Sequence, residues 1–324
     1  MFSHRTRPER QSRFLLFDTR PGERSLRGVW MLLAIFFASL VAAAIAAPIV
    51  YNGLRFAHAL TGWDSLRLED KSAAKIFDAL RTAAIVPALP WLLRTCRSNP
   101  PFRLPLGLVP LRDWGLGFSA GLALIAAIVA LHLAFAPIVL APVAGWPQRL
   151  AQKFAIGWFT GVFEETIFRV FMLGIIYTAV RSPVAALVWT SVIYAWLHFR
   201  APNLIWVATG QAMDWSTGWA LAGWSLTGVA VEFDLPLFFI LFMLGMLLGA
   251  LRLQSRTLWP VIGLHTGVVM GFLIYKDGQV VDAGGANAFW GTARLTDSWA
   301  VAAALAVCLA ALSLWPRRVD AGTA

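Results

Sequence analysis

The sequence predicts an all-α fold, a polytopic transmembrane helix bundle with about eight spans. Apolar residues make up 59% of the 324 residues and charged residues only 14%, whereas roughly a quarter of a soluble domain is charged. Long apolar runs recur along the chain, and about 20 apolar residues suffice to cross a bilayer. This composition excludes a disordered chain. The Ala-, Gly- and Pro-rich runs exclude a transmembrane barrel, whose strands are short and alternating.

The chain divides into a basic N-terminal tail, one transmembrane domain and a short C-terminal tail. Residues 1–27 hold seven arginines against three acids and contain no cleavable signal pattern, so we expect a cytoplasmic tail. Residues 28–318 form the single helical domain, and residues 319–324 form the C-terminal tail. The expected spans are 28–50, 76–93, 114–141, 154–178, 183–200, 235–251, 257–275 and 298–315.

Loop charge predicts the orientation of this domain. With the N-terminus inside, the inner segments carry 16 Lys and Arg residues and the outer segments carry nine. Cytoplasmic loops hold the excess of these residues, so both termini are expected in the cytoplasm. The chain is bacterial in style, which predicts the inner (plasma) membrane. The net charge of +10 does not indicate nucleic-acid binding, because the arginines cluster in short loops between apolar runs.

Residues 201–234, between the fifth and sixth spans, are rich in tryptophan. They contain Trp206, Trp215, Trp219 and Trp224 among Gly and Ala residues. Tryptophan favours the membrane–water interface. Two interpretations stay open, a surface or re-entrant segment and a partly ordered loop.

The fourth span contains charged side chains, which are costly inside a bilayer and are therefore functional candidates. Glu165 and Arg169 stand four residues apart with the acid first, the favourable order for a helical ion pair. Glu164 is rotated by about 100° from Glu165 and shares a face with Gly157 and Gly161, whose spacing lets another helix approach. Glu164 is thus the expected working carboxylate, and a purely structural charge cluster is the alternative.

The fifth span ends with Tyr194 and His198, which are four residues apart on one helical face. If spans four and five turn at Arg181, Glu164 and His198 lie 17 residues on either side of that turn. Both then lie about 25 Å from the turn, at one depth. A carboxylate and an imidazole so placed can bind and deprotonate a water molecule.

The seventh span carries His265 well inside an apolar run. Gly263, Gly267 and Gly271 form a stripe for close helix packing, and His265 is rotated about 200° away from it, towards a different neighbour. Counted from the turn near Gln254, His265 is expected about 9 Å shallower than the other two candidates.

These residues resemble, in order, three motifs of the CPBP family, the CaaX-processing intramembrane proteases and their bacteriocin-processing relatives. The motifs are Glu164-Glu165-x-x-x-Arg169, then Tyr194-x-x-x-His198, then an intramembrane His265. The resemblance covers a protease-like core at about 150–275.

The resemblance implies an enzyme, an intramembrane endopeptidase that hydrolyses a peptide bond in or near the bilayer. Carried over by position, Glu164 is the base that activates water, His198 holds that water, and His265 stabilises the oxyanion or shares a metal site. Glu165, Arg169 and Tyr194 are the supporting residues.

The same resemblance leaves the cofactor open between none and zinc. Two His and one carboxylate with an open position can form a catalytic zinc shell, here Glu164, His198 and His265. A buried glutamate can also act as base without a metal, and we favour this version. The expected partners are a membrane-associated peptide or protein substrate and the lipid bilayer, with no nucleic acid.

Two positions depart from the family pattern. Tyr194 stands where the family usually has Phe, and Val269 stands where it usually has Asn. Valine cannot donate to an oxyanion, and one such donor contributes roughly 3–4 kcal/mol. Either Thr266 or Asn203 replaces the donor, or the protein is slow or inactive.

Two other functions stay open. Val269 supports a non-catalytic membrane scaffold or immunity protein that retains the motifs for packing. Buried Glu and His residues also form the proton relays of coupled transporters. The sequence shows none of the inverted repeats that many transporters contain, which counts against a transporter.

Overall fold

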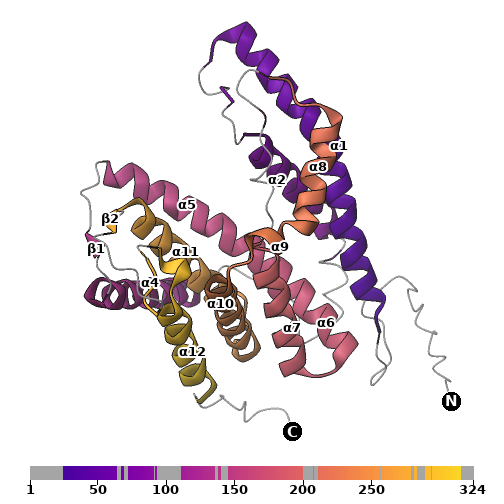
Figure 1. The fold of residues 1–324 in the computed structure, drawn as a ribbon. Helices are drawn as coiled ribbons and strands as arrows, with labels where there is room; N and C mark the ends of the chain where they lie inside the picture. Colours follow the sequence, from indigo (N-terminus) through magenta and orange to yellow (C-terminus); the bar gives the residue numbers. More distant parts are fainter. Residues whose placement is uncertain are drawn as a thin grey trace, which may run out of the picture.

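The computed structural model describes residues 25–63, 67–68, 72–90, 92, 111–135, 138–139, 145–199, 207, 211–255, 257–278, 281–282, 289–292 and 294–314. Helices dominate this part of the chain (Figure 1). The α-helices are α1 (Arg27–Thr61), α2 (Ser72–Ile85), α4 (Leu111–Phe135), α5 (Trp146–Glu165), α6 (Leu173–Val180), α7 (Pro183–Trp196), α8 (Trp215–Thr227), α9 (Val229–Glu232), α10 (Leu235–Gln254), α11 (Trp259–Asp277) and α12 (Trp299–Leu314). The smaller elements are η2 (Val86–Ala88), η4 (Thr166–Met172), η6 (Leu295–Asp297), β1 (Ile138–Val139) and β2 (Val281–Asp282), and β1 pairs antiparallel with β2.

The fold class predicted from the sequence, an all-α polytopic bundle, is confirmed. Each of the eight predicted spans overlaps a helix of the structure. Among the described residues, α1, α4 and α10 are long and apolar enough to cross a membrane, and α7 and α12 are shorter apolar helices. The predicted tail 319–324 and nearly all of the predicted tail 1–27 lie outside the described residues.

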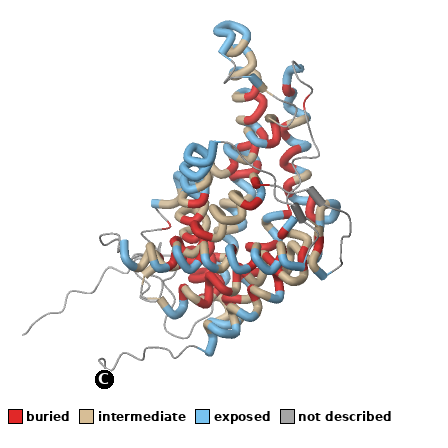
Figure 2. Tube along the Cα trace, turned by 90° about the vertical axis from the view of Figure 1, so that its left-hand side faces the viewer, coloured by how far each residue is buried: buried red, intermediate tan, exposed pale blue. Residues whose placement is uncertain are grey.

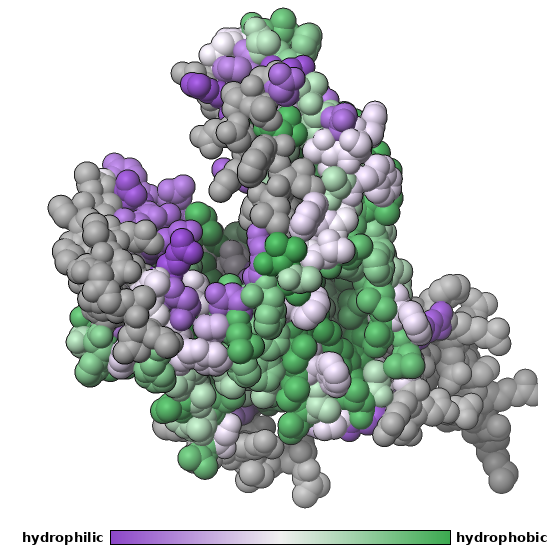
Figure 3. Space-filling view, viewed as in Figure 1, coloured by the Kyte–Doolittle hydropathy of each residue, from purple (hydrophilic) through white to green (hydrophobic). Residues whose placement is uncertain are grey.

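Helix α1 presents a continuous apolar face to its surroundings. Large exposed side chains recur at every third or fourth position, namely Trp30, Leu33, Phe37, Val41, Ile45 and Ile49. The opposite face is buried at small residues such as Ala43, Ala44 and Ala47. Exposed and buried faces alternate around the helices in Figure 2, and Figure 3 shows a broad hydrophobic surface over α6 and α7. These outer faces suit a lipid environment.

The tryptophan-rich segment includes helix α8, which packs against α1 and α2. Asp214 caps this helix by accepting from the Thr217 N–H at 2.7 Å. The Asn52 amide of α1 donates to the Met213 carbonyl at 2.7 Å, just before the cap. Trp206 lies outside the described residues. The helix over residues 215–227 counts against the interpretation of this part as a partly ordered loop.

Glycines let α11 and α4 meet backbone to backbone. A methyl group at Gly263 or Gly267 of α11 would overlap the Trp114 or Phe118 carbonyl oxygen of α4. A methyl group at Gly121 of α4 would overlap the backbone of α11 in return. The glycine stripe therefore has the packing role that its spacing predicts, and it fixes the rotation of α11.

An adjacent face of α11 packs on α5. A methyl group at Gly157 would lie 2.9 Å from the Thr266 carbonyl oxygen, and one at Gly161 would lie 2.8 Å from the Thr266 hydroxyl. The close approach predicted for these two glycines is thus observed, and α11 is held between α4 and α5.

The fourth predicted span is not one regular helix. Helix α5 ends at Glu165 and is followed by η4, a π-helical segment that contains Arg169, before α6 begins. Such segments are rare and frequently occur at functional sites. The π-helix changes the rotation of the chain directly after the two glutamates.

Ion pairs connect one end of α5 to one end of α11. Asp277 lies 3.0 Å from the Lys153 ammonium and 3.2 Å from the Arg149 guanidinium. The hydrogen bond from Lys153 lowers the pKa of the Asp277 carboxyl. Hydrophilic residues gather over this end of α5 in Figure 3, which is consistent with contact with water beyond the predicted spans.

We predict that Gly121→Ala lowers the free energy of unfolding by about 1–3 kcal/mol, because the added methyl group forces α4 away from α11. Gly115 of the same helix has nothing within 4 Å of an added methyl group. Gly115→Ala should therefore be neutral or stabilise by about 0.5–1 kcal/mol. Thermal unfolding in lipid micelles measures both variants, and equal effects would contradict this packing.

Candidate active site

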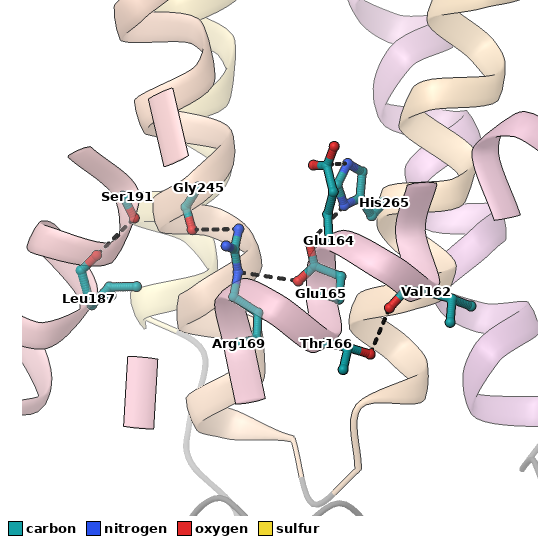
Figure 4. A network of polar contacts seen from close by, with 9 residues as sticks. All are labelled: Val162, Glu164, Glu165, Thr166, Arg169, Leu187, Ser191, Gly245 and His265. Atoms are coloured by element: carbon teal, nitrogen blue, oxygen red, sulfur yellow. Dashed lines mark hydrogen bonds and ion pairs between the residues drawn. The ribbon is translucent and has the colours of Figure 1, made fainter. Parts of the chain in front are cut away.

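The buried carboxylate of Glu165 contacts the Arg169 guanidinium and the His265 imidazole inside the bundle (Figure 4). Its Oε2 lies 3.2 Å from Arg169 Nε, the pair that their spacing predicts. Its Oε1 accepts from His265 Nδ1 at 2.7 Å. Arg169 Nη2 also donates to the Gly245 carbonyl of α10 at 3.3 Å. The cluster therefore connects the end of α5 and η4 to both α11 and α10.

Burial gives this cluster its energetic weight. The exposed fractions of Glu165, Arg169 and His265 are 0%, 1% and 1%. The guanidinium also lies 5.2 Å from the ring centre of Tyr194, a cation–π contact. Removing one member of a buried pair leaves a charge without compensation, so these residues hold one another in place.

The predicted depth of His265 is wrong. Its Nε2 lies 3.8 Å from Glu164 Oε2, so the imidazole stands beside the glutamates rather than about 9 Å shallower. The predicted depth assumed a helix from Gln254 to His265, but α11 begins only at Trp259. Non-helical backbone can cover more than twice the helical rise per residue, and the π-helical η4 interrupts the fourth span.

His198 lies in the turn that follows α7, with its ring centre 4.7 Å from that of Tyr194. Its Nδ1 lies 2.8 Å from the Tyr194 carbonyl oxygen. A carbonyl oxygen only accepts, so Nδ1 carries the proton and the neutral ring presents an Nε2 lone pair.

A cavity of about 320 Å³ brings the candidate residues together. Glu164, Tyr194, His198 and His265 all contribute to its wall, and Val269 lies in the same wall. Most of the remaining lining is apolar and comes from α4, α10, α11 and α12. The side chain of Glu164 is 24% exposed, although its Oε2 atom is buried.

A second cavity, of about 270 Å³, adjoins the same groups. It shares Glu164, His198 and Thr160 with the first cavity and is also lined by Arg81 of α2. The carboxylate and the imidazole therefore stand where two cavities meet, although no direct contact joins them.

The sequence of this region matches a known family. Residues 145–271 fit the family model described as type II CAAX prenyl endopeptidase Rce1-like. This region is similar to the CPBP family of CAAX proteases. The match runs from the start of α5 into α11 and includes Glu164, Glu165, Arg169, Tyr194, His198 and His265.

The family indicates a CAAX-type intramembrane protease in general terms, and with the apolar helices it indicates an integral membrane protein. No match was found among curated proteins or among solved structures. Helices α1, α2, α4 and α12 lie outside the region matched by the CAAX protease family. Even so, α4 sets the rotation of α11, and α2 lines the second cavity.

Zinc does not fit the described geometry. Among the described residues, no group of three or more His, Cys, Asp and Glu side chains is placed to hold a metal ion. The ligands considered from the sequence were Glu164, His198 and His265. We therefore derive no chemical step through a metal.

The two suggested replacements for the missing asparagine gain no support. The Thr266 hydroxyl donates to the Ile262 carbonyl of its own helix at 2.8 Å and is absent from the cavity lining. Asn203 lies outside the described residues. Sequence reasoning also missed the Glu165–His265 bond, because nothing local links residues 100 positions apart.

We predict that Arg169→Met costs about 3–5 kcal/mol of folding free energy, since it leaves Glu165 buried without its ion-pair partner. The matched control is Arg149→Met, which removes an ion-pair partner of Asp277. The Arg149 side chain is 45% exposed. An exposed pair contributes only about 0–1 kcal/mol. Unfolding in lipid micelles compares the variants, and similar small losses would show that the Glu165 cluster does not stabilise the bundle.

Proposed function

We propose that the protein is an intramembrane endopeptidase in which Glu164 activates a water molecule, with His198 and His265 assisting. The observation that carries this proposal is the shared cavity, to which all three side chains contribute. Its mostly apolar walls suit a peptide that enters from the bilayer.

The hydrogen-bond directions suit a hydrolytic water. The ionised Glu164 carboxylate and the His198 Nε2 lone pair both accept, so each can hold one water proton while the oxygen faces the substrate carbonyl. Glu164 takes a proton as the water oxygen bonds to the carbonyl carbon. The C–N bond then breaks, and Glu164 returns the proton to the leaving amine. One water is consumed, and an acid and an amine are released.

Glu165 and Arg169 act as positioning residues in this proposal. The Glu165 carboxylate fixes Nδ1 of His265, and Nε2 of the same ring then faces Glu164 at 3.8 Å. Arg169 in turn fixes Glu165 at 3.2 Å. Glu165 and Arg169 thus hold the imidazole that lies beside the base.

The proposed substrate is a membrane-associated peptide or protein that lies across the wall between the two cavities. Glu164 and His198 line both spaces, so a bond held there is within reach of the activated water. The proposed setting is a bacterial inner membrane with both termini in the cytoplasm, as the loop charges predict.

One observation favours the second candidate, a non-catalytic scaffold. Val269 lines the cavity and offers no donor to the oxyanion. A scaffold that retains the motifs only for packing has no need for a glutamate in a cavity wall, however, and Glu164 lines both cavities. This position of Glu164 favours hydrolysis.

We predict that Glu164→Gln abolishes peptide cleavage while the protein stays folded and inserted, because an amide cannot take the water proton. Purified wild type and variant in lipid are incubated with a degenerate peptide library, and new termini are read by mass spectrometry. Glu232→Gln, the same change in α9 away from the cavities, is the matched control and should cleave at the wild-type rate.

A zinc chelator added to the same incubation tests the metal-free version. Cleavage that persists with chelator is the expected result. Loss of cleavage on chelation would instead require a metal at the site. A Glu164→Gln variant as active as wild type would contradict the proposed mechanism.

A further inference from the structure

The developing oxyanion needs a hydrogen-bond donor, and the orientation of His198 does not supply one. Its Nδ1 proton is used by the Tyr194 carbonyl oxygen at 2.8 Å. The Nε2 atom of the neutral ring therefore faces the cavity as an acceptor. This lone pair can accept a hydrogen bond from water, but it repels a negatively charged oxygen.

His265 is engaged in a comparable way. Its Nδ1 donates to Glu165, so Nε2 of the neutral ring is also an acceptor. In the protonated ring, the second N–H faces Glu164, whose Oε2 lies 3.8 Å away. The neutral ring therefore offers no donor from Nε2, and the N–H of the protonated ring is directed at Glu164.

In the wall of the first cavity, the remaining donors among the described residues are hydroxyl groups. They belong to Thr160, Tyr194 and Thr296, since Val269 carries no donor. An oxyanion donor is effective when it is fixed in advance beside the reacting atoms. The contacts of these three residues therefore decide between them.

Tyr194 is the hydroxyl-bearing residue with fixed neighbours on several sides. It is 1% exposed. Its ring makes an edge contact with Phe168 at 5.0 Å and lies 5.2 Å from the Arg169 guanidinium carbon. The imidazoles of His198 and His265 have their centres 4.7 and 6.4 Å from it. No comparable contacts hold Thr160 or Thr296 within the described residues.

The hydroxyl of Tyr194 also interacts with the Glu164 carboxylate. In the free enzyme this anion is the natural acceptor for the phenol proton. Once Glu164 has taken a proton from water, its negative charge has moved through the attacking oxygen to the substrate carbonyl oxygen. The phenol then has a stronger acceptor in the transition state than in the ground state, which is the condition for catalysis.

We propose that Tyr194 is a catalytic residue whose hydroxyl donates to the oxyanion and so replaces the donor that Val269 cannot provide. This inference rests on the proposed peptidase function. The phenol keeps its proton throughout, and the leaving amine receives its proton from Glu164.

The test is a set of variants assayed on an internally quenched peptide that carries the sequence best cleaved by wild type in the library. Tyr194→Phe keeps the ring and should retain the wild-type melting temperature. We expect its kcat to fall by about 100- to 1,000-fold, with KM within a factor of two. Tyr177→Phe, the same change in α6 outside both cavity linings, should stay within threefold of wild type.

A rescue experiment adds a second reading. The kcat of the double variant Tyr194→Phe, Val269→Asn should be at least tenfold higher than that of Tyr194→Phe, since an amide N–H then faces the cavity.

The outcomes separate this inference from the proposed function. Wild-type kcat in Tyr194→Phe, or an equal loss in Tyr177→Phe, would overturn the role of Tyr194. An inactive Glu164→Gln variant would still support the peptidase. Equal activity in Glu164→Gln and wild type would overturn the peptidase mechanism itself. A Tyr194→Phe protein with reduced kcat and a lowered melting temperature, not rescued by Val269→Asn, would assign Tyr194 a structural role and overturn the inference.

Discussion

The candidate site depends on a single buried carboxylate, Glu165, which is shared between Arg169 and His265. Two groups on opposite sides of one carboxylate leave it little freedom to rotate, at 3.2 Å to the guanidinium and 2.7 Å to the imidazole. Isolated charges are costly in an apolar interior, so the cluster forms as a unit. Its orientation directs His265 Nε2 towards Glu164.

Helix packing delivers His265 to this cluster. Glycines on one face of α11 meet the backbone of α4, and two glycines of α5 meet an adjacent face of α11. Small residues allow such approach in membrane proteins, where apolar burial does not drive helices together. The same small residues that bring the helices together therefore set the rotation that aims the imidazole. Positions far from the chemistry, such as Gly263, thus belong to the architecture of the site.

Local spacing was enough to predict much of this arrangement. The order and spacing of Glu165 and Arg169 predicted their ion pair, and the glycine stripes predicted close helix contacts. The bond from Glu165 to His265 spans 100 residues, and nothing in local periodicity specifies which distant side chain meets which. The depth of His265 was predicted wrongly because residue counts give depth only along regular helices. The π-helical η4 and the late start of α11 both depart from that assumption.

The central claim is that Glu164 activates water instead of bonding to the substrate. Single-turnover cleavage in ¹⁸O-labelled water tests it most directly, with mass spectrometry of both the new carboxyl terminus and the peptide that contains Glu164. The account predicts one ¹⁸O atom in the product carboxylate and none in the Glu164 side chain. Label in Glu164, accompanied by an unlabelled product, would show a covalent route through an anhydride and would contradict the account.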